Sequence, residues 1–67
     1  MTINCIDERV KIIKKLWNRE HDPHVIDILL KQLNNDITYF CSERIPYELQ
    51  IQIDELTEEV HKYDNHQ

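Results

Sequence analysis

The chain has 67 residues, with 13 acidic and 8 basic side chains and a net charge of −5. A chain of this length forms one small domain, and one this acidic lacks the basic surface that binds the phosphate backbone of nucleic acids. It has no signal-peptide pattern, no apolar run long enough to cross a bilayer, and two cysteines, too few for a disulfide scaffold, so we expect a cytoplasmic protein that binds neither nucleic acid nor membrane.

The first predicted helix covers residues 4–20. Asn4 is the predicted N-cap, and the helix should end near residues 18–21, because the proline that follows disfavours helical backbone in front of it. Ile12 and Leu16 widen the apolar face on one side. The chain has no glycine, so the next turn must be made by other residues. The main apolar stripe has the three-and-four spacing of one helix face and contains Ile3, Ile6, Val10, Ile13 and Trp17.

The central predicted helix covers residues 22–42. Asp22 is a suitable N-cap, and Pro23 suits the first helical position, where its missing N–H is not needed. Its apolar stripe has the same spacing and contains Ile26, Leu30, Leu33, Ile37 and Phe40.

The two stripes match layer by layer when the helices form an antiparallel hairpin. The five predicted layers are Trp17–Ile26, Ile13–Leu30, Val10–Leu33, Ile6–Ile37 and Ile3–Phe40. This register places Cys5 and Cys41 at the open end of the hairpin. We expect both cysteines to be small buried side chains at that end, although the geometry also allows a disulfide between them.

The third predicted helix covers residues 46–63, with Pro46 in its first turn. Its stripe is out of phase with the central one, which favours a real break over one long kinked helix from Asp22 to Tyr63. The sequence therefore predicts an all-α fold, an antiparallel helical hairpin plus a third helix in a small three-helix bundle, which we expect dimerisation to complete. The stripe contains Leu49, Ile53, Leu56, Val60 and Tyr63.

Residues that could carry chemistry lack the spacing that chemistry requires. His21, Asp22 and His24 span a proline and a helix cap, whereas zinc sites use about four ligands at tight paired spacings. Adjacent carboxylates such as Asp54 and Glu55 are expected to form a solvated face, because so thin a chain offers no deep pocket. We therefore predict no catalytic residues, no metal and no cofactor.

A helix, a turn with Asp-Pro and Val-Ile within residues 22–26, and a second helix with Leu and Ile at heptad spacing together resemble a known family. The family is the small helical-hairpin aspartyl-phosphate phosphatases that regulate sporulation in bacilli, and the similar region is residues 6–40. Its members act on a phosphorylated response regulator through a Ser-x-x-x-Asp motif on the second helix. Here those positions are Leu30 and Asn34, so the resemblance implies a protein without that activity. Activity of that kind is the alternative prediction.

Apolar side chains outside the three stripes predict contacts with another protein chain. A hairpin hides one face of each helix, and the central helix is apolar around much of its circumference. We therefore expect a non-enzymatic regulatory protein that binds and modulates another protein, such as a transcription or signalling factor, through amphipathic helices, and that also forms a homodimer. The predicted partner-binding residues are Val25, Ile28, Leu29, Asn34, Asp36, Tyr39, Ile51, Glu55, Glu58 and Glu59.

Overall fold

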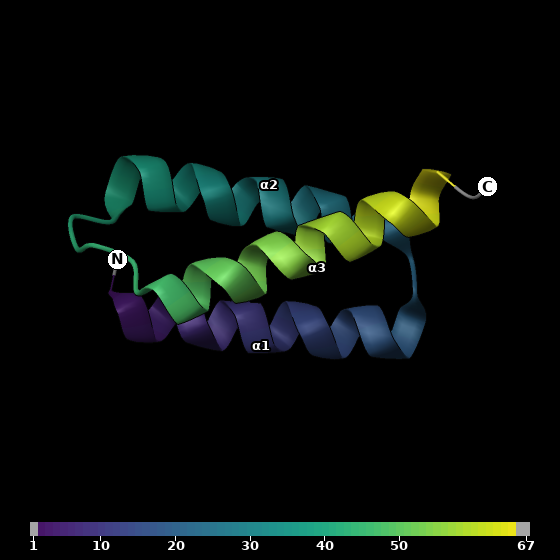
Figure 1. The fold of residues 1–67 in the computed structure, drawn as a ribbon, viewed down its shortest axis with the longest axis horizontal. Coiled ribbons are helices and arrows are strands. Elements are labelled where there is room, and N and C mark those ends of the chain that lie inside the picture. The colour runs from purple at the N-terminus through teal and green to yellow at the C-terminus, as the bar shows by residue number, and fades with distance from the viewer. Residues whose placement is uncertain (1, 66–67) are drawn as a thin grey trace.

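Three α-helices joined by two short connections form the fold, and a computed structural model describes residues 2–65 (Figure 1). Helix α1 spans Ile3–Glu20, α2 spans Pro23–Phe40 and α3 spans Tyr47–Asn65. Helices α1 and α2 form the antiparallel hairpin, and α3 lies across the front of both in Figure 1. The predicted all-α three-helix bundle is confirmed.

Helix α1 begins one residue earlier than predicted. Thr2 has extended backbone and its hydroxyl accepts a hydrogen bond from the Cys5 N–H at 3.3 Å, so Thr2 is the N-cap. The prediction of Asn4 as the cap is therefore wrong, because Asn4 is already inside the first turn. The helix ends at Glu20, within the predicted range.

The turn between α1 and α2 is made by two residues. His21 takes the left-handed conformation (φ 54°, ψ 34°), and its N–H donates to the Trp17 carbonyl at 3.0 Å. Asp22 is the N-cap of α2, and its carboxylate accepts from the N–H groups of His24 and Val25 at 3.1 and 3.4 Å. The prediction of an Asp-Pro helix start after a turn without glycine is confirmed.

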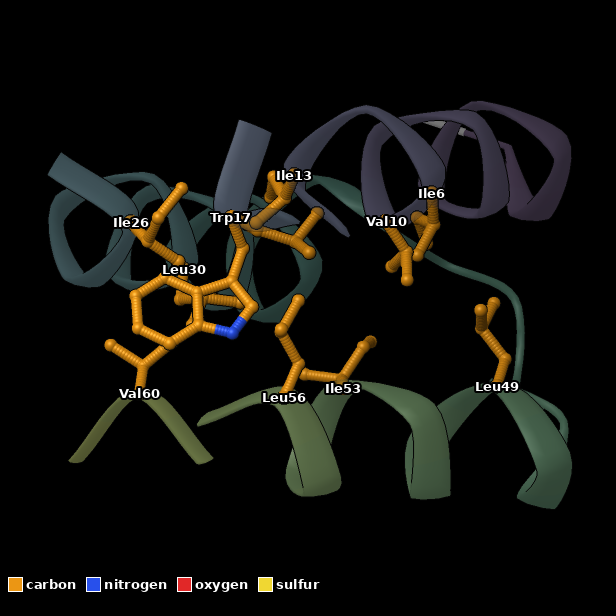
Figure 2. Close-up of a cluster of buried hydrophobic side chains, with 11 residues drawn as sticks. Ile6, Val10, Ile13, Trp17, Ile26, Leu30, Leu49, Ile53, Leu56 and Val60 are labelled. Atoms are coloured by element: carbon orange, nitrogen blue, oxygen red, sulfur yellow. The ribbon is translucent and has the colours of Figure 1, made fainter. Parts of the chain in front are cut away.

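The core is a layer of apolar side chains between the three helices (Figure 2). It contains the predicted stripes over most of their length, and no polar or charged residue is buried within the described part of the chain. The buried residues are Ile6, Val10, Ile13, Trp17, Ile26, Leu30, Leu33, Leu49, Ile53, Leu56 and Val60.

The open end of the hairpin differs from the prediction. Helix α2 ends at Phe40, two residues early, and Phe40 is 68% exposed, so the predicted layer of Ile3 against Phe40 is not part of the buried core. The backbone turns away at Cys41, and Cys41 and Ile45 of the connection pack against the core instead.

The two cysteines differ in their exposure to solvent. Cys41 is half-buried, but Cys5 is exposed, which corrects the expectation that both are buried; both thiols are free. Residues 41–46 are non-helical, so the alternative of one long kinked helix is wrong. Pro46 immediately precedes α3, and its carbonyl accepts from the Gln50 N–H at 3.0 Å. Among the described residues, no helix is both long and apolar enough to cross a membrane.

Candidate functional site

Helix α3 covers one side of the α1–α2 hairpin. Two contacts identify that side: Lys14 of α1 donates to Gln52 at 3.2 Å, and Asp27 of α2 pairs with His61 at 3.2 Å. On each helix a second set of apolar side chains lies away from α3, on the opposite flank or, for Ile28, on the outward side of α2. We call this set the hairpin face, and it contains Ile12, Leu16, Val25, Ile28 and Leu29.

The hairpin face exposes apolar side chains on both helices of the hairpin. Ile28, Ile12 and Val25 are 64%, 55% and 42% exposed, while Leu16 and Leu29 are half-buried against the core. A groove of about 120 Å³ runs between α1 and α2, and its lining includes Ile12, Leu16 and Leu29. Single exposed apolar residues are ordinary, but adjacent ones around a groove are typical of binding surfaces.

An ion pair closes one end of this groove. Arg9, which lines it, donates from Nη1 to Oδ2 of Asp36 at 2.7 Å, and Gln32 Nε2 donates to the other carboxylate oxygen at 3.1 Å. Both oxygens of Asp36 therefore have partners within the chain. The apolar part of the hairpin face thus lies between this polar boundary and the α1–α2 turn.

Two cations lie beside the hairpin face on α1. Lys15 and Arg19 are exposed, each three residues after a hairpin-face residue, and they form no ion pair among the described residues. On α2, by contrast, Lys31 pairs with Asp27 at 2.9 Å. The hydrogen bond from Lys31, and then that from His61, lowers the pKa of the Asp27 carboxyl against the effect of burial. Only the α1 flank therefore presents uncompensated positive charge to a partner.

A second groove, of about 210 Å³, lies between α1 and α3 and is mainly polar at its rim. At its base is Trp17, whose ring stacks on His21 at 4.3 Å and meets Tyr63 edge-on at 5.3 Å. The indole Nε1 is buried and has no hydrogen-bond partner in the described structure. The other lining residues are Lys14, Asn18, Gln52, Glu55, Leu56 and Glu59. The lining of this groove is more polar than that of the groove on the hairpin face.

The residues predicted to bind a partner fall on separate surfaces. Val25, Ile28 and Leu29 lie together on the hairpin face, and Tyr39 lies further along α2, 73% exposed. Asn34 is exposed on α2, and Asp36, also on α2, is paired with Arg9. The remaining predicted residues lie on α3: Ile51 half-buried, Glu58 3.9 Å from Lys62, and Glu55 and Glu59 at the α1–α3 groove.

Sequence reasoning missed the α1 half of the hairpin face as a site. Ile12 and Leu16 lie beside the main stripe, four residues apart, and the sequence pattern assigns both to a wider apolar face. Ile12 is also one of the apolar residues left over from the stripes, but it is not among the predicted partner-binding residues. The cations Lys15 and Arg19 belong to a basic segment over residues 1–20, but surface charges are common and do not identify a binding site by themselves.

Reactive groups are dispersed over the structure. No group of three or more His, Cys, Asp and Glu side chains within the described residues could hold a metal ion. The hydrogen bond with Thr2 lowers the pKa of the exposed Cys5 thiol. Leu30, at the serine position of the phosphatase motif, is 2% exposed in the core, and Asn34 is on the surface.

Comparison of the chain with protein-family models, with curated proteins and with solved structures finds no match. The resemblance to the sporulation phosphatases therefore stays a prediction, and the function must be argued from the geometry of this chain.

Proposed function

We propose that this protein is a non-enzymatic regulatory module that binds another protein through its hairpin face and modulates that protein's activity. The observation that carries the proposal is the exposure of Ile12, Val25 and Ile28, three large apolar side chains that are 42–64% exposed on the two helices of the hairpin. A groove lined by Ile12, Leu16 and Leu29 lies between these helices. Contact of such side chains with water is unfavourable. A partner that covers them therefore stabilises the complex by roughly 25 cal/mol per Å² of apolar surface removed from water. The proposal places the protein in the cytoplasm, where both cysteines stay reduced.

The residues at the phosphatase positions support the non-enzymatic part of this proposal. Leu30 has no group that could replace a serine, and it is buried where no substrate reaches it. Asn34 is an amide where that family has a carboxylate, and the nearest acid along the helix, Asp36, has both oxygens occupied by Arg9 and Gln32. An assay with phosphorylated response regulators should therefore show no release of phosphate.

The test of binding compares two variants of the purified, tagged protein in affinity capture from host extract. Ile12→Glu/Ile28→Glu places two charges on the hairpin face at exposed positions, so the fold should be retained. Tyr47→Glu is the control for an added charge elsewhere on the surface, since it replaces a 79% exposed aromatic residue at the start of α3. Circular dichroism checks that both are helical.

We expect a specific protein to be retained by the wild type and by Tyr47→Glu, and lost with Ile12→Glu/Ile28→Glu. Retention of the same protein by all three would place the binding surface elsewhere and overturn the proposal.

A further inference from the structure

We infer that the partner segment bound by the hairpin face is an amphipathic α-helix with acidic side chains along one flank. This inference rests on the proposed function and names the chemistry of its partner. The shape of the site, its length and its charge each contribute to it.

The shape favours a helix. The groove lies between two antiparallel helices, and such a groove accepts a third helix whose side-chain ridges fit between those of the pair. The chain itself contains this arrangement on its other side, where Leu49, Ile53, Leu56 and Val60 of α3 pack against α1 and α2. A partner helix on the hairpin face would therefore complete a four-helix bundle around the hairpin.

The length of the apolar surface sets the length of the contact. Ile12 and Leu16 on α1, like Val25 and Leu29 on α2, are one helical turn apart, and the Arg9–Asp36 pair ends the groove beyond them. With the side chains included, this surface matches about three turns of a helix, with apolar residues at i, i+3, i+4 and i+7. A segment of roughly 11 residues covers that distance.

The unpaired positive charges on α1 determine which flank of the partner helix is acidic. Lys15 and Arg19 are four residues apart, so their like charges repel weakly, and neither has an acidic partner. A helix in the groove brings one of its flanks beside them, where Glu or Asp would pair with both. The opposite flank lies along α2, where Lys31 reaches Asp27 on the side that α3 covers and so gains less from a new anion.

A second copy of the chain fits this surface less well. A two-fold interface pairs identical patches, so two hairpin faces would bring four uncompensated cations together. Helix α3 is acidic, with Glu48, Asp54, Glu55, Glu58, Glu59 and Asp64 against Lys62, but its apolar stripe is already used in its own core.

The test uses two labelled helical peptides of about 18 residues. Both carry the same Leu stripe, and one has Glu and the other Lys along the flanks. Fluorescence anisotropy measures binding to the full chain at low salt. The variants are Lys15→Glu/Arg19→Glu, which reverses the flank, and Arg44→Glu/Lys62→Glu, which makes the same change in net charge away from the hairpin face.

We expect the Glu peptide to bind the wild type about tenfold more tightly than the Lys peptide. Lys15→Glu/Arg19→Glu should reverse that order, Arg44→Glu/Lys62→Glu should preserve it, and Ile12→Glu/Ile28→Glu should weaken both peptides.

The unfavourable outcomes are distinguishable. If both peptides bind equally and Ile12→Glu/Ile28→Glu binds neither, the partner helix does not need acidic side chains. That result would overturn the inference but leave the proposed function intact. Binding of neither peptide would overturn the inference, and so would sedimentation showing a dimer that Ile12→Glu/Ile28→Glu dissociates, since a second copy would then occupy the face. If the Glu peptide binds tightly and Ile12→Glu/Ile28→Glu binds it equally well, the peptide occupies another surface. That result would overturn both the inference and the assignment of the hairpin face as the binding surface.

Discussion

Arg9 of α1 and Asp36 of α2 form an ion pair of 2.7 Å between residues 27 positions apart in the sequence. Their side chains are 31% and 22% exposed, so the pair is partly shielded from water. It joins the two helices of the hairpin on the side that α3 does not cover, and it ends the apolar groove. Asp36, predicted from the sequence to contact a partner, thus has a role within the fold.

A double-mutant cycle of Arg9→Ala and Asp36→Ala should give a coupling energy of about 0.5–1 kcal/mol in the free energy of unfolding. Urea denaturation measures it, and the coupling should fall at high salt because the pair still contacts solvent. A coupling of zero at low salt would show that the pair does not join α1 to α2.

The left-handed backbone of His21 predicts an unusual ranking of two substitutions. His21→Gly and His21→Ala both remove the ring that stacks on Trp17, but only Ala retains the Cβ that makes φ 54° unfavourable. The Gly variant should therefore be more stable than the Ala variant by about 1 kcal/mol, the reverse of their order inside a helix. Thermal unfolding of the two proteins measures the difference. Greater stability of the Ala variant would mean that residue 21 is not left-handed.

The helix caps predict a contrast between two polar residues. Asp22→Ala removes the acceptor for the N–H groups of His24 and Val25 and should lower the free energy of unfolding by about 1 kcal/mol. Asn4→Ala is the control, because Asn4 is exposed inside the first turn of α1 while Thr2 caps that helix, so its effect should stay within about 0.5 kcal/mol. Chemical denaturation checks both, and equal losses would contradict the cap assignment.

The contacts of Asp27 predict that the free energy of unfolding depends on pH. Lys31 and His61 lower its pKa in the folded chain, so its ionised form stabilises the fold above the unfolded-state pKa of about 4, and that stability is lost as pH falls through the lowered folded pKa. Asp27→Asn should therefore lower the free energy of unfolding at neutral pH by about 0.5 kcal/mol. The gap between wild type and variant should close below pH about 4. A gap that persists in acid would assign the loss to packing instead.

The helices could be predicted from the sequence because burial imposes a period on the apolar residues, and that period is visible without coordinates. A register for the hairpin that starts at Trp17–Ile26 could be predicted because two stripes of equal spacing align in few ways, and the residues of its first three layers are buried in one core. The last layer failed at Phe40 because helix ends depend on local hydrogen bonds and on what the next segment offers. Here Cys41 and Ile45 pack against the core at that end, while Phe40 is exposed.

The candidate site was predictable in part. Val25, Ile28 and Leu29 were surplus to the α2 stripe, so they indicated a second apolar surface. Ile12 was equally apolar, but only the position of α3 decides which flank of α1 is covered. The Arg9–Asp36 pair depends on side-chain geometry across two helices, which periodicity does not reveal.

The central claim is that the hairpin face binds a partner protein, and site-specific photo-crosslinking in host cells tests it most directly. A benzophenone amino acid replaces Ile28 on the hairpin face in one variant and Tyr47 on α3 in the other, both more than half exposed. We predict a discrete adduct with another protein from position 28 and none from position 47. An adduct from position 47 with none from position 28 would contradict the account.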